Sequence, residues 1–234
     1  MILRRIASAI KRQDWFVVFI EIVIVVIGVY IGIYLGDIQT ERKLLADTNR
    51  ALEALEDELR SDLERLDEVI AHQTNMVAVQ QRAVGLLGAD ELDEAVIGPL
   101  FDFILGANDT FFPNRSAYKA MQTGGFLEAL PDEALRLQIT RLVEREYERI
   151  DFNANSYDEI TQVFGLSILP NYWDRARSKL LKGDPGGAVK IQNGVMHVNG
   201  MGEFYLGLVT DLVRPEMIKT LQMIDAYQGE GEAE

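Results

Sequence analysis

The chain has 234 residues, of which 26% are charged and 48% are hydrophobic, and its formal net charge at pH 7 is −14. A chain of this length has room for one membrane anchor and one globular domain. A single run of residues approaches the ~20 apolar positions needed to cross a bilayer, which excludes a transporter with several spans. The absence of cysteine excludes disulfide bonds, thiolate chemistry and lipoprotein acylation.

The apolar run WFVVFIEIVIVVIGVYIGIYL covers Trp15 to Leu35 and is interrupted only by Glu21. At about 1.5 Å per residue, this run is roughly as long as the hydrocarbon core of a bilayer is thick. It therefore predicts a transmembrane helix over 15–36. The run is longer than the ~7 to 15 apolar residues of a cleavable signal peptide, and no A-x-A site follows it, so we expect an uncleaved signal anchor.

The segment 1–14 is a basic leader that contains one acid, Asp14. Its basic residues are Arg4, Arg5, Lys11 and Arg12. Basic residues beside a span mark its cytoplasmic end, and the rest of the chain carries a net charge of −17. We expect a protein of the bacterial inner membrane with its N-terminus in the cytoplasm and its C-terminal domain in the periplasm. Membrane lipid is then one partner, whereas nucleic acid is not, because the acidic domain repels it.

One side of the predicted span carries small residues and an acid. On a helical wheel of about 100° per residue, this glycine face comprises Glu21, Val25, Gly28, Gly32 and Gly36. Glycines four residues apart let two helix backbones approach closely in lipid. A carboxylate inside the membrane costs at least ~2.5 kcal/mol on insertion scales, so it is expected to face protein or water. The glycine face therefore predicts a packing interface.

Residues 37–88 predict one long amphipathic helix. Its buried side follows spacings of three and four residues. This leucine stripe comprises Leu45, Thr48, Leu52, Leu55, Leu59, Leu63, Leu66, Ile70, Gln73 and Val77. On one straight helix the stripe points roughly 180° away from the glycine face, so a single two-helix seam cannot use both surfaces. We expect the stripe to pack on the chain's own domain; a bend near Gly36 is the alternative.

Residues 89–227 predict a helical domain, so the fold class is mainly α with one small β-hairpin. An acidic first turn predicts a helix that begins at Asp90. A loop is expected over 106–114, and a short helix over 116–122 that ends at a pair of glycines. Pro131 is expected to open a second long amphipathic helix, which is the natural packing partner of the leucine stripe.

The last part of the domain carries the strongest turn signals. A helix is expected from Pro170 to Lys182. Asn193-Gly194 stands between two short alternating runs and predicts a β-hairpin at about 189–198. A last helical region is expected to be kinked or split at Pro215. The acidic tail 228–234 is expected to be disordered.

Two segments resemble a known family. EIVIVVIGVYIGIYLGDIQTERK, Glu21–Lys43, looks like the opening of an uncharacterised family of bacterial single-span membrane proteins, in which a basic leader precedes the span and a charged helix follows it. SAYKAMQTGGFLEALPDEALRLQI, Ser116–Ile139, is similar to a second element of that family, a short helix that ends at glycine before a leucine-rich helix. The resemblance implies a shared architecture and no activity.

The polar residues give little sign of catalysis. The two histidines, His72 and His197, stand outside any metal-ligand spacing, and nucleophilic catalysis needs a hydroxyl or thiol beside a base. The paired acids Asp90 with Glu91 and Asp93 with Glu94 are explained as helix-start acids. We expect a protein that is not an enzyme and that holds no cofactor and no metal.

The function predicted from these features is that of an assembly or accessory subunit. Its glycine face would pack against a larger membrane complex or against a second copy of the chain, and its helical domain would stand in the periplasm. One alternative is a proton-coupled transducer that uses Glu21, because the layout resembles the single-span stator subunits of ion-driven motors. Another is a periplasmic ligand sensor, which requires a pocket lined by convergent polar groups.

Overall fold

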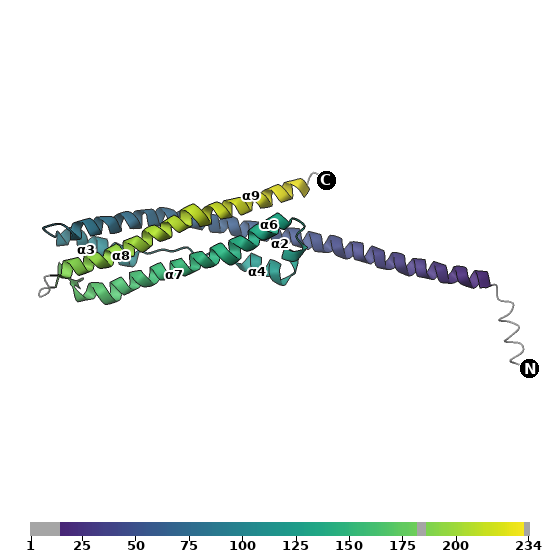
Figure 1. Cartoon of the computed structure of the whole chain (residues 1–234), viewed down its shortest axis with the longest axis horizontal. Coiled ribbons are helices and arrows are strands. Elements are labelled where there is room, and N and C mark those ends of the chain that lie inside the picture. Colours follow the sequence, from purple (N-terminus) through teal and green to yellow (C-terminus); the bar gives the residue numbers. More distant parts are fainter. Residues whose placement is uncertain (1–14, 182–185, 232–234) are drawn as a thin grey trace, which may run out of the picture. The chain divides into compact units, whose positions relative to one another are not determined.

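A computed structural model describes residues 15–181 and 186–231. The chain divides into two compact units, Met1–Asn49 and Arg50–Glu234. The predicted basic residues of the leader lie outside the described residues. They are Arg4, Arg5, Lys11 and Arg12. Helix α2, Trp15–Leu87, begins in the first unit and ends in the second (Figure 1).

The first unit consists of the N-terminal part of α2 as far as the described residues go. Its most apolar window of 18 residues has a mean hydropathy of 2.0, and none of that window is buried. Within the described part of the chain, α2 is the one helix long and apolar enough to cross a membrane, a test that a signal sequence also passes. The helix is continuous through Gly36, whose carbonyl oxygen accepts a hydrogen bond from Thr40 Oγ1 at 2.9 Å.

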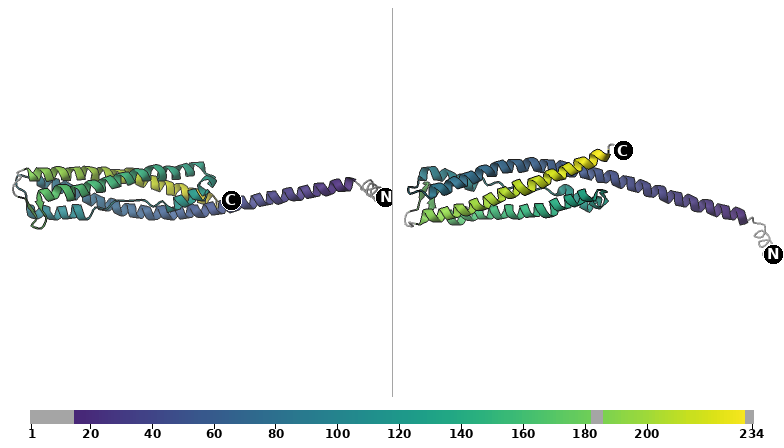
Figure 2. Two further views of the ribbon diagram at one scale, coloured as in Figure 1. Left: turned by 90° about the horizontal axis from the view of Figure 1, so that it is seen from below. Right: turned by 45° about the horizontal axis from the view of Figure 1, so that its top comes forward.

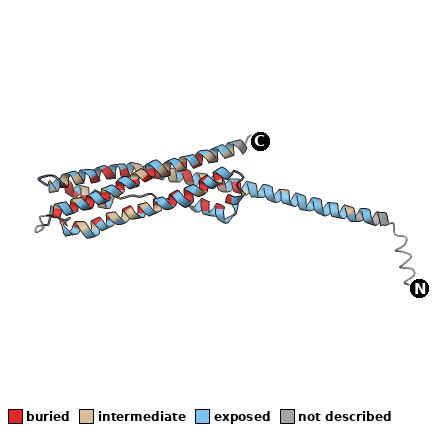
Figure 3. Cartoon of the chain, viewed as in Figure 1, coloured by how far each residue is buried: buried red, intermediate tan, exposed pale blue. Residues whose placement is uncertain are grey.

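The second unit is a bundle of long helices with its core between them (Figures 1 and 3). The leucine stripe of α2 contributes to this core, as predicted, because apolar side chains at helical spacing are removed from water together. The stripe residues buried in the unit are Leu52, Leu55, Leu59, Leu66, Gln73 and Val77. The prediction of a mainly α fold with a small β-hairpin is confirmed.

Three shorter helices follow α2. They are α3 (Glu94–Gly106), α4 (Ser116–Thr123) and α5 (Phe126–Ala129). The expected start of α3 at Asp90 is wrong: its N-cap is Asp93, whose carboxylate accepts hydrogen bonds from the next backbone N–H groups. The predicted end of α4 at a pair of glycines is confirmed. Gly125 has φ of +71°, a conformation that suits a residue without Cβ.

The predicted second long helix is present and runs almost unbroken to a 3-10 turn. It consists of α6 (Glu133–Arg141), a π turn η1 (Leu142–Glu146), α7 (Tyr147–Val163), a second π turn η2 (Phe164–Ile168) and the 3-10 turn η3 (Leu169–Asn171). A π turn inserts one extra residue into a helix, and such turns are frequent at functional sites. Each π turn rotates the residues after it about the helix axis. This rotation keeps the apolar side of the long helix directed towards the bundle core.

The β-hairpin lies elsewhere than predicted. Its strands are β1 (Trp173–Asp174) and β2 (Lys179–Leu180), an antiparallel pair inside the segment expected to be helical. It is fixed to α3, because the Leu180 N–H donates to Glu94 Oε1 at 2.8 Å. Trp173 packs edge-on against Phe101 of the same helix, with ring centroids 5.1 Å apart.

Residues 189–198, expected to form the hairpin, belong to α8 (Gly187–Leu208). Gly194 is therefore no turn residue. A Cβ on Gly194 would lie 2.7 Å from Phe164 Cδ2, so the glycine permits close approach of α8 to η2. The tertiary contact decides the conformation here over the local turn preference of Asn193-Gly194.

The last helix continues α8 through a third π turn, η4 (Val209–Val213), into α9 (Arg214–Gly231). Pro215 has no N–H and its ring crowds the preceding turn, so a π turn just before it accommodates the proline without ending the helix. The predicted irregularity near Pro215 is thus a π turn. The expected disorder of 228–234 is wrong for 228–231, which are helical, and its remainder lies outside the described residues.

The three long helical segments of the second unit, which are the C-terminal part of α2, the run from α6 to η2 and the run from α8 to α9, lie side by side in all views (Figures 1 and 2). Buried polar contacts link them. Gln80 Nε2 of α2 donates to Tyr157 Oη of α7 at 2.8 Å. Tyr157 stacks on Tyr205 of α8, whose Oη accepts the Phe111 N–H at 2.7 Å. These bonds satisfy polar groups that would be costly to bury alone.

Candidate functional site

The predicted glycine face is uncovered within the described part of the chain. Added Cβ atoms on Gly28, Gly32 and Gly36 would meet nothing within 4 Å. Val25 is 64% exposed. Glu21 belongs to α2, but its side chain lies outside what the structure describes. The apolar surface around these glycines would be unfavourable in water and suits lipid or another helix.

The two histidines occupy structural or surface positions. A ring nitrogen of His72 hydrogen bonds to the carbonyl oxygen of Ala107, and its ring lies 6.1 Å from that of Phe103. His197 is exposed on α8. Among the described residues, no group of three or more His, Asp or Glu side chains suits a metal ion.

The paired acids at the start of α3 have separate roles. Asp93 caps the helix through hydrogen bonds from the N–H groups of Ala95 and Val96. Glu94 holds the hairpin through the Leu180 N–H. Each carboxylate is thus occupied by backbone donors, which explains these acids without acid–base catalysis.

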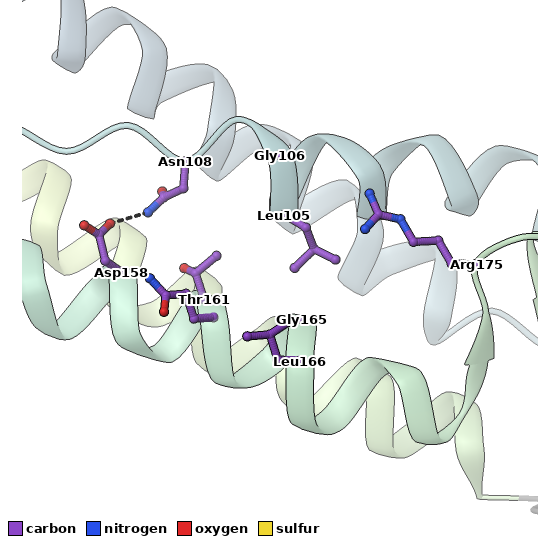
Figure 4. A pocket seen from close by; sticks show the side chains of 9 residues that line it. Leu105, Gly106, Asn108, Asp158, Thr161, Gly165, Leu166 and Arg175 are labelled. Atoms are coloured by element: carbon purple, nitrogen blue, oxygen red, sulfur yellow. Dashed lines mark hydrogen bonds between the residues drawn. The ribbon is translucent and has the colours of Figure 1, made fainter.

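A cleft of about 410 Å³ lies in the second unit, where sequence reasoning placed no site (Figure 4). The C-terminal end of α3 and the loop after it form one wall, with Leu105 and Asn108. The opposite wall comes from α7 and η2, with Asp158 and Gly165, and Arg175 of the hairpin completes the cleft. The contributing segments are far apart in the sequence, so no local motif marks this site.

Asp158 is the half-buried acid of this cleft. Its Oδ1 accepts a hydrogen bond from Asn108 Nδ2 at 2.6 Å, and its Oδ2 accepts one from Thr110 Oγ1 at 2.9 Å. Burial raises the pKa of Asp158, while these two hydrogen bonds oppose the increase and nearby Asp109 adds to it. The carboxylate is therefore held in a fixed position by neutral donors.

The cation of the cleft is Arg175, whose Nε donates to Asp102 Oδ1 at 2.7 Å. Its side chain is 64% exposed. Arginine has five N–H donors, so this single bond leaves the terminal guanidinium nitrogens with capacity for a second anion. The cleft thus combines one carboxylate and one guanidinium in a single cavity.

A second group of acids lies where α2 meets the loop before α4. Asp62 Oδ2 accepts the Asn114 N–H at 2.8 Å, and Glu58 Oε2 accepts the Ala117 N–H at 3.0 Å. Burial raises the pKa of Asp62 to about 6, and repulsion from Glu58 contributes to the increase. Asp62 thus holds the loop and Glu58 holds the first turn of α4, and burial disfavours the charged form of Asp62.

Replacing Asp62 with asparagine is expected to stabilise the domain at neutral pH. The pKa of about 6 in the folded chain lies above the ~3.9 of an unfolded aspartate, so the folded state binds more protons between these values. The free energy of unfolding therefore falls as the pH rises through this range. Asparagine keeps an acceptor for the Asn114 N–H and removes the charge. Because the group is half exposed, we expect a gain of only about 1 kcal/mol at about pH 7.5, shrinking towards about pH 5.

Urea denaturation of the full chain in detergent at both pH values measures this difference. Glu64→Gln, which removes an exposed acid from the same helix, is the control and should show no comparable pH-dependent gain. An Asp62→Asn variant that is less stable than the wild type at both pH values contradicts the account.

Comparison with protein families gives one match. A family model described as a family of unknown function (DUF6090) matches residues 21–167, which is more than half of the chain. The chain belongs to this DUF6090 family. The match includes both segments whose resemblance to an uncharacterised family was recognised in the sequence, together with the cleft residues Leu105, Asn108, Asp158 and Gly165. Comparisons with curated proteins and with solved structures give no match.

Proposed function

We propose that this DUF6090 protein is a non-enzymatic, single-pass subunit of the bacterial inner membrane that docks through its glycine face onto another transmembrane helix. The observation that carries the proposal is the uncovered apolar surface at Gly28, Gly32 and Gly36. In lipid there is no hydrophobic force between helices, so close backbone packing at small residues supplies much of the attraction.

The partner is an integral membrane protein or a second copy of the chain. The leader with Arg4, Arg5, Lys11 and Arg12 places the N-terminus in the cytoplasm under the positive-inside rule, which leaves the helical domain in the periplasm. Burial of the leucine stripe from Leu52 onward supports separate roles for the two parts of α2, because these side chains pack inside the second unit and are unavailable to a membrane partner; Leu45, nearer the span, is exposed.

Replacing both Gly28 and Gly32 with leucine is expected to release the chain from its partner. Two leucine side chains would hold the backbones apart and remove the close contact. The measurement is co-purification in mild detergent from cells that contain two differently tagged copies, which separates self-association from binding to another protein. A loss of association of at least about tenfold is expected, equivalent to about 1.4 kcal/mol.

The matched control is the double variant Val26→Leu and Tyr30→Leu on the opposite side of the helix, where the side chains are 60% and 71% exposed. It changes the same number of span residues and should leave association intact. Unchanged association of the glycine variant, or an equal loss of association in both variants, contradicts the proposal.

A further inference from the structure

The segment 107–115, termed the strap, connects α3 to α4 and contains neither helix nor strand. Within the described part of the chain, its backbone hydrogen bonds to other backbone groups lie only at its two ends. There the Ala107 N–H donates to the Phe103 carbonyl oxygen, and the Arg115 carbonyl oxygen accepts from the Lys119 N–H. Side chains of other helices therefore hold its middle on the bundle. A segment held in this way can open locally while the helices stay folded.

Acidic side chains fasten the strap near both of its ends. Near α3, Asp158 of α7 accepts hydrogen bonds from Asn108 Nδ2 at 2.6 Å and from Thr110 Oγ1 at 2.9 Å (Figure 4). Near α4, Asp62 of α2 accepts the Asn114 N–H at 2.8 Å. Each acid belongs to another helix and is half-buried, so lifting the strap would bring water to both carboxylates.

Closing the strap brings several like charges together. The charged residues that bond to the strap, to the first turn of α4 or to one another there include five acids and two arginines, which are Glu58, Asp62, Asp109, Asp151, Asp158, Arg65 and Arg115. Arg65 pairs with Asp109 at 2.6 Å, and Arg115 pairs with Asp151 at 2.7 Å. The bonds of the other three acids go to neutral donors. Ionised acids this close repel one another, so each added negative charge opposes closure.

Burial under the closed strap favours the protonated form of both fastening acids. It raises the pKa of Asp62 to about 6; repulsion from Glu58 adds to this increase, while the Asn114 N–H and Arg115 oppose it. Burial also raises the pKa of Asp158. An open strap with hydrated carboxylates binds protons less tightly, so closure is favoured in acid and weakens as the pH rises through about 6.

Other titratable side chains that face the two fastening acids do not reverse this effect. Burial raises the pKa values of the phenols of Tyr147, Tyr157 and Tyr205, so they stay neutral between about pH 5 and about pH 8. A ring nitrogen of His72 hydrogen bonds to the Ala107 carbonyl oxygen, and a protonated ring can donate this bond as well. The carboxyl groups therefore control the response of the strap to pH.

We propose that the strap is a pH-responsive closure of the bundle, which is fastened at about pH 5 and opens more often at about pH 7.5 because its carboxyl groups lose their protons. Opening uncovers Phe111, which is 1% exposed and whose N–H donates to Tyr205 Oη at 2.7 Å. This apolar side chain and this bond keep the closed form the major one at both pH values. The strap uses no residue of the glycine face, so its test can fail independently of the proposed function.

Amide hydrogen exchange of the full chain in detergent, measured by mass spectrometry at about pH 5 and about pH 7.5 and corrected for intrinsic exchange rates, tests the proposal. For Asp62, a pKa of about 6 in the closed strap and ~3.9 in the open strap corresponds to about tenfold more opening at the higher pH. Because Asp62 is half exposed, we expect the protection of residues 107–117 to fall by about three- to tenfold. At both pH values these amides should exchange faster than those of residues 195–208 in α8, which are released only when the bundle opens.

Two variants connect the response to the fastening acid. Asp62→Asn removes the charge and keeps an acceptor for the Asn114 N–H, so the protection of residues 114–117 should change by less than about twofold between the two pH values. The matched control is Glu64→Gln, which removes an exposed acid from the same helix and should keep the wild-type response. Wild-type protection that does not fall with rising pH, an undiminished response in Asp62→Asn, an equal loss of response in both variants, or exchange of the strap as slow as that of residues 195–208 overturns the proposal.

Discussion

Replacing Leu66 with alanine should lower the free energy of unfolding by about 2 to 5 kcal/mol. Leu66 lies on the leucine stripe of α2, has 0% exposure and belongs to the core of the second unit. The loss combines the transfer free energy of the removed methyl groups with the cost of the cavity that remains. An effect of this size would show that the stripe is committed to the chain's own domain.

Tryptophan fluorescence during urea denaturation measures this change. Trp173 is buried and reports on the second unit, and a Trp15→Phe background removes the other tryptophan. Leu137→Ala is the matched control: Leu137 is 58% exposed on α6, so its truncation should change the free energy of unfolding by no more than about 0.5 kcal/mol. Equal effects of the two substitutions contradict burial of the stripe.

Replacing Gly194 with alanine should destabilise the domain by about 1 to 3 kcal/mol, although alanine is the better helix former. The added Cβ would lie 2.7 Å from Phe164 Cδ2 and 3.0 Å from Phe164 Cε2, so Phe164 and η2 would have to shift. Phe164 is itself buried at 1% exposure, which limits that movement.

Gly200→Ala in the same helix is the matched control for this prediction. A Cβ on Gly200 would meet nothing within 4 Å, so only the helix preference changes and a gain of up to about 1 kcal/mol is expected. Opposite signs for the two glycines in urea denaturation support a helix over 189–198. Loss at Gly200 as large as at Gly194 would instead favour a conformation that needs glycine at both positions.

The leucine stripe of α2 and the conformation around Gly194 show which parts of the fold can be predicted from the sequence. The leucine stripe was predictable because a pattern of three and four residues along an uninterrupted helix reports directly on burial. The end of α4 was predictable because paired glycines suit a helix terminus, and Gly125 adopts the expected positive φ. Local patterns of this kind determine local structure when no tertiary contact opposes them.

The misplaced hairpin shows the opposite case. Asn193-Gly194 is a strong turn signal on its own. In the structure, however, Gly194 lies within α8, where the missing Cβ lets the helix approach Phe164. The real hairpin is held by Glu94 of α3, a partner more than 80 residues away in the sequence, which no local pattern reveals. The same reason hides the cleft: Asp158 and Arg175 come to line one cavity only when α3, α7 and the hairpin have packed.

The glycine face differs from both cases, because its pattern was visible in the sequence and no described residue of the chain packs on its glycines. Val25, Gly28 and Gly32 leave a surface that the described residues do not cover. Glu21 shares this face on the helical wheel, and a carboxylate inside the membrane is costly unless it faces protein or water.

Cysteine cross-linking in native membranes tests this central claim most directly, since the chain has no cysteine of its own. Single substitutions Gly28→Cys and Gly32→Cys are introduced on the glycine face, with Val26→Cys and Tyr30→Cys on the other side. A thiol-reactive cross-linker should join the chain to its partner from the two glycine positions and not from the two controls. Adducts that form equally from all four positions, or from the controls alone, would contradict docking through the glycine face.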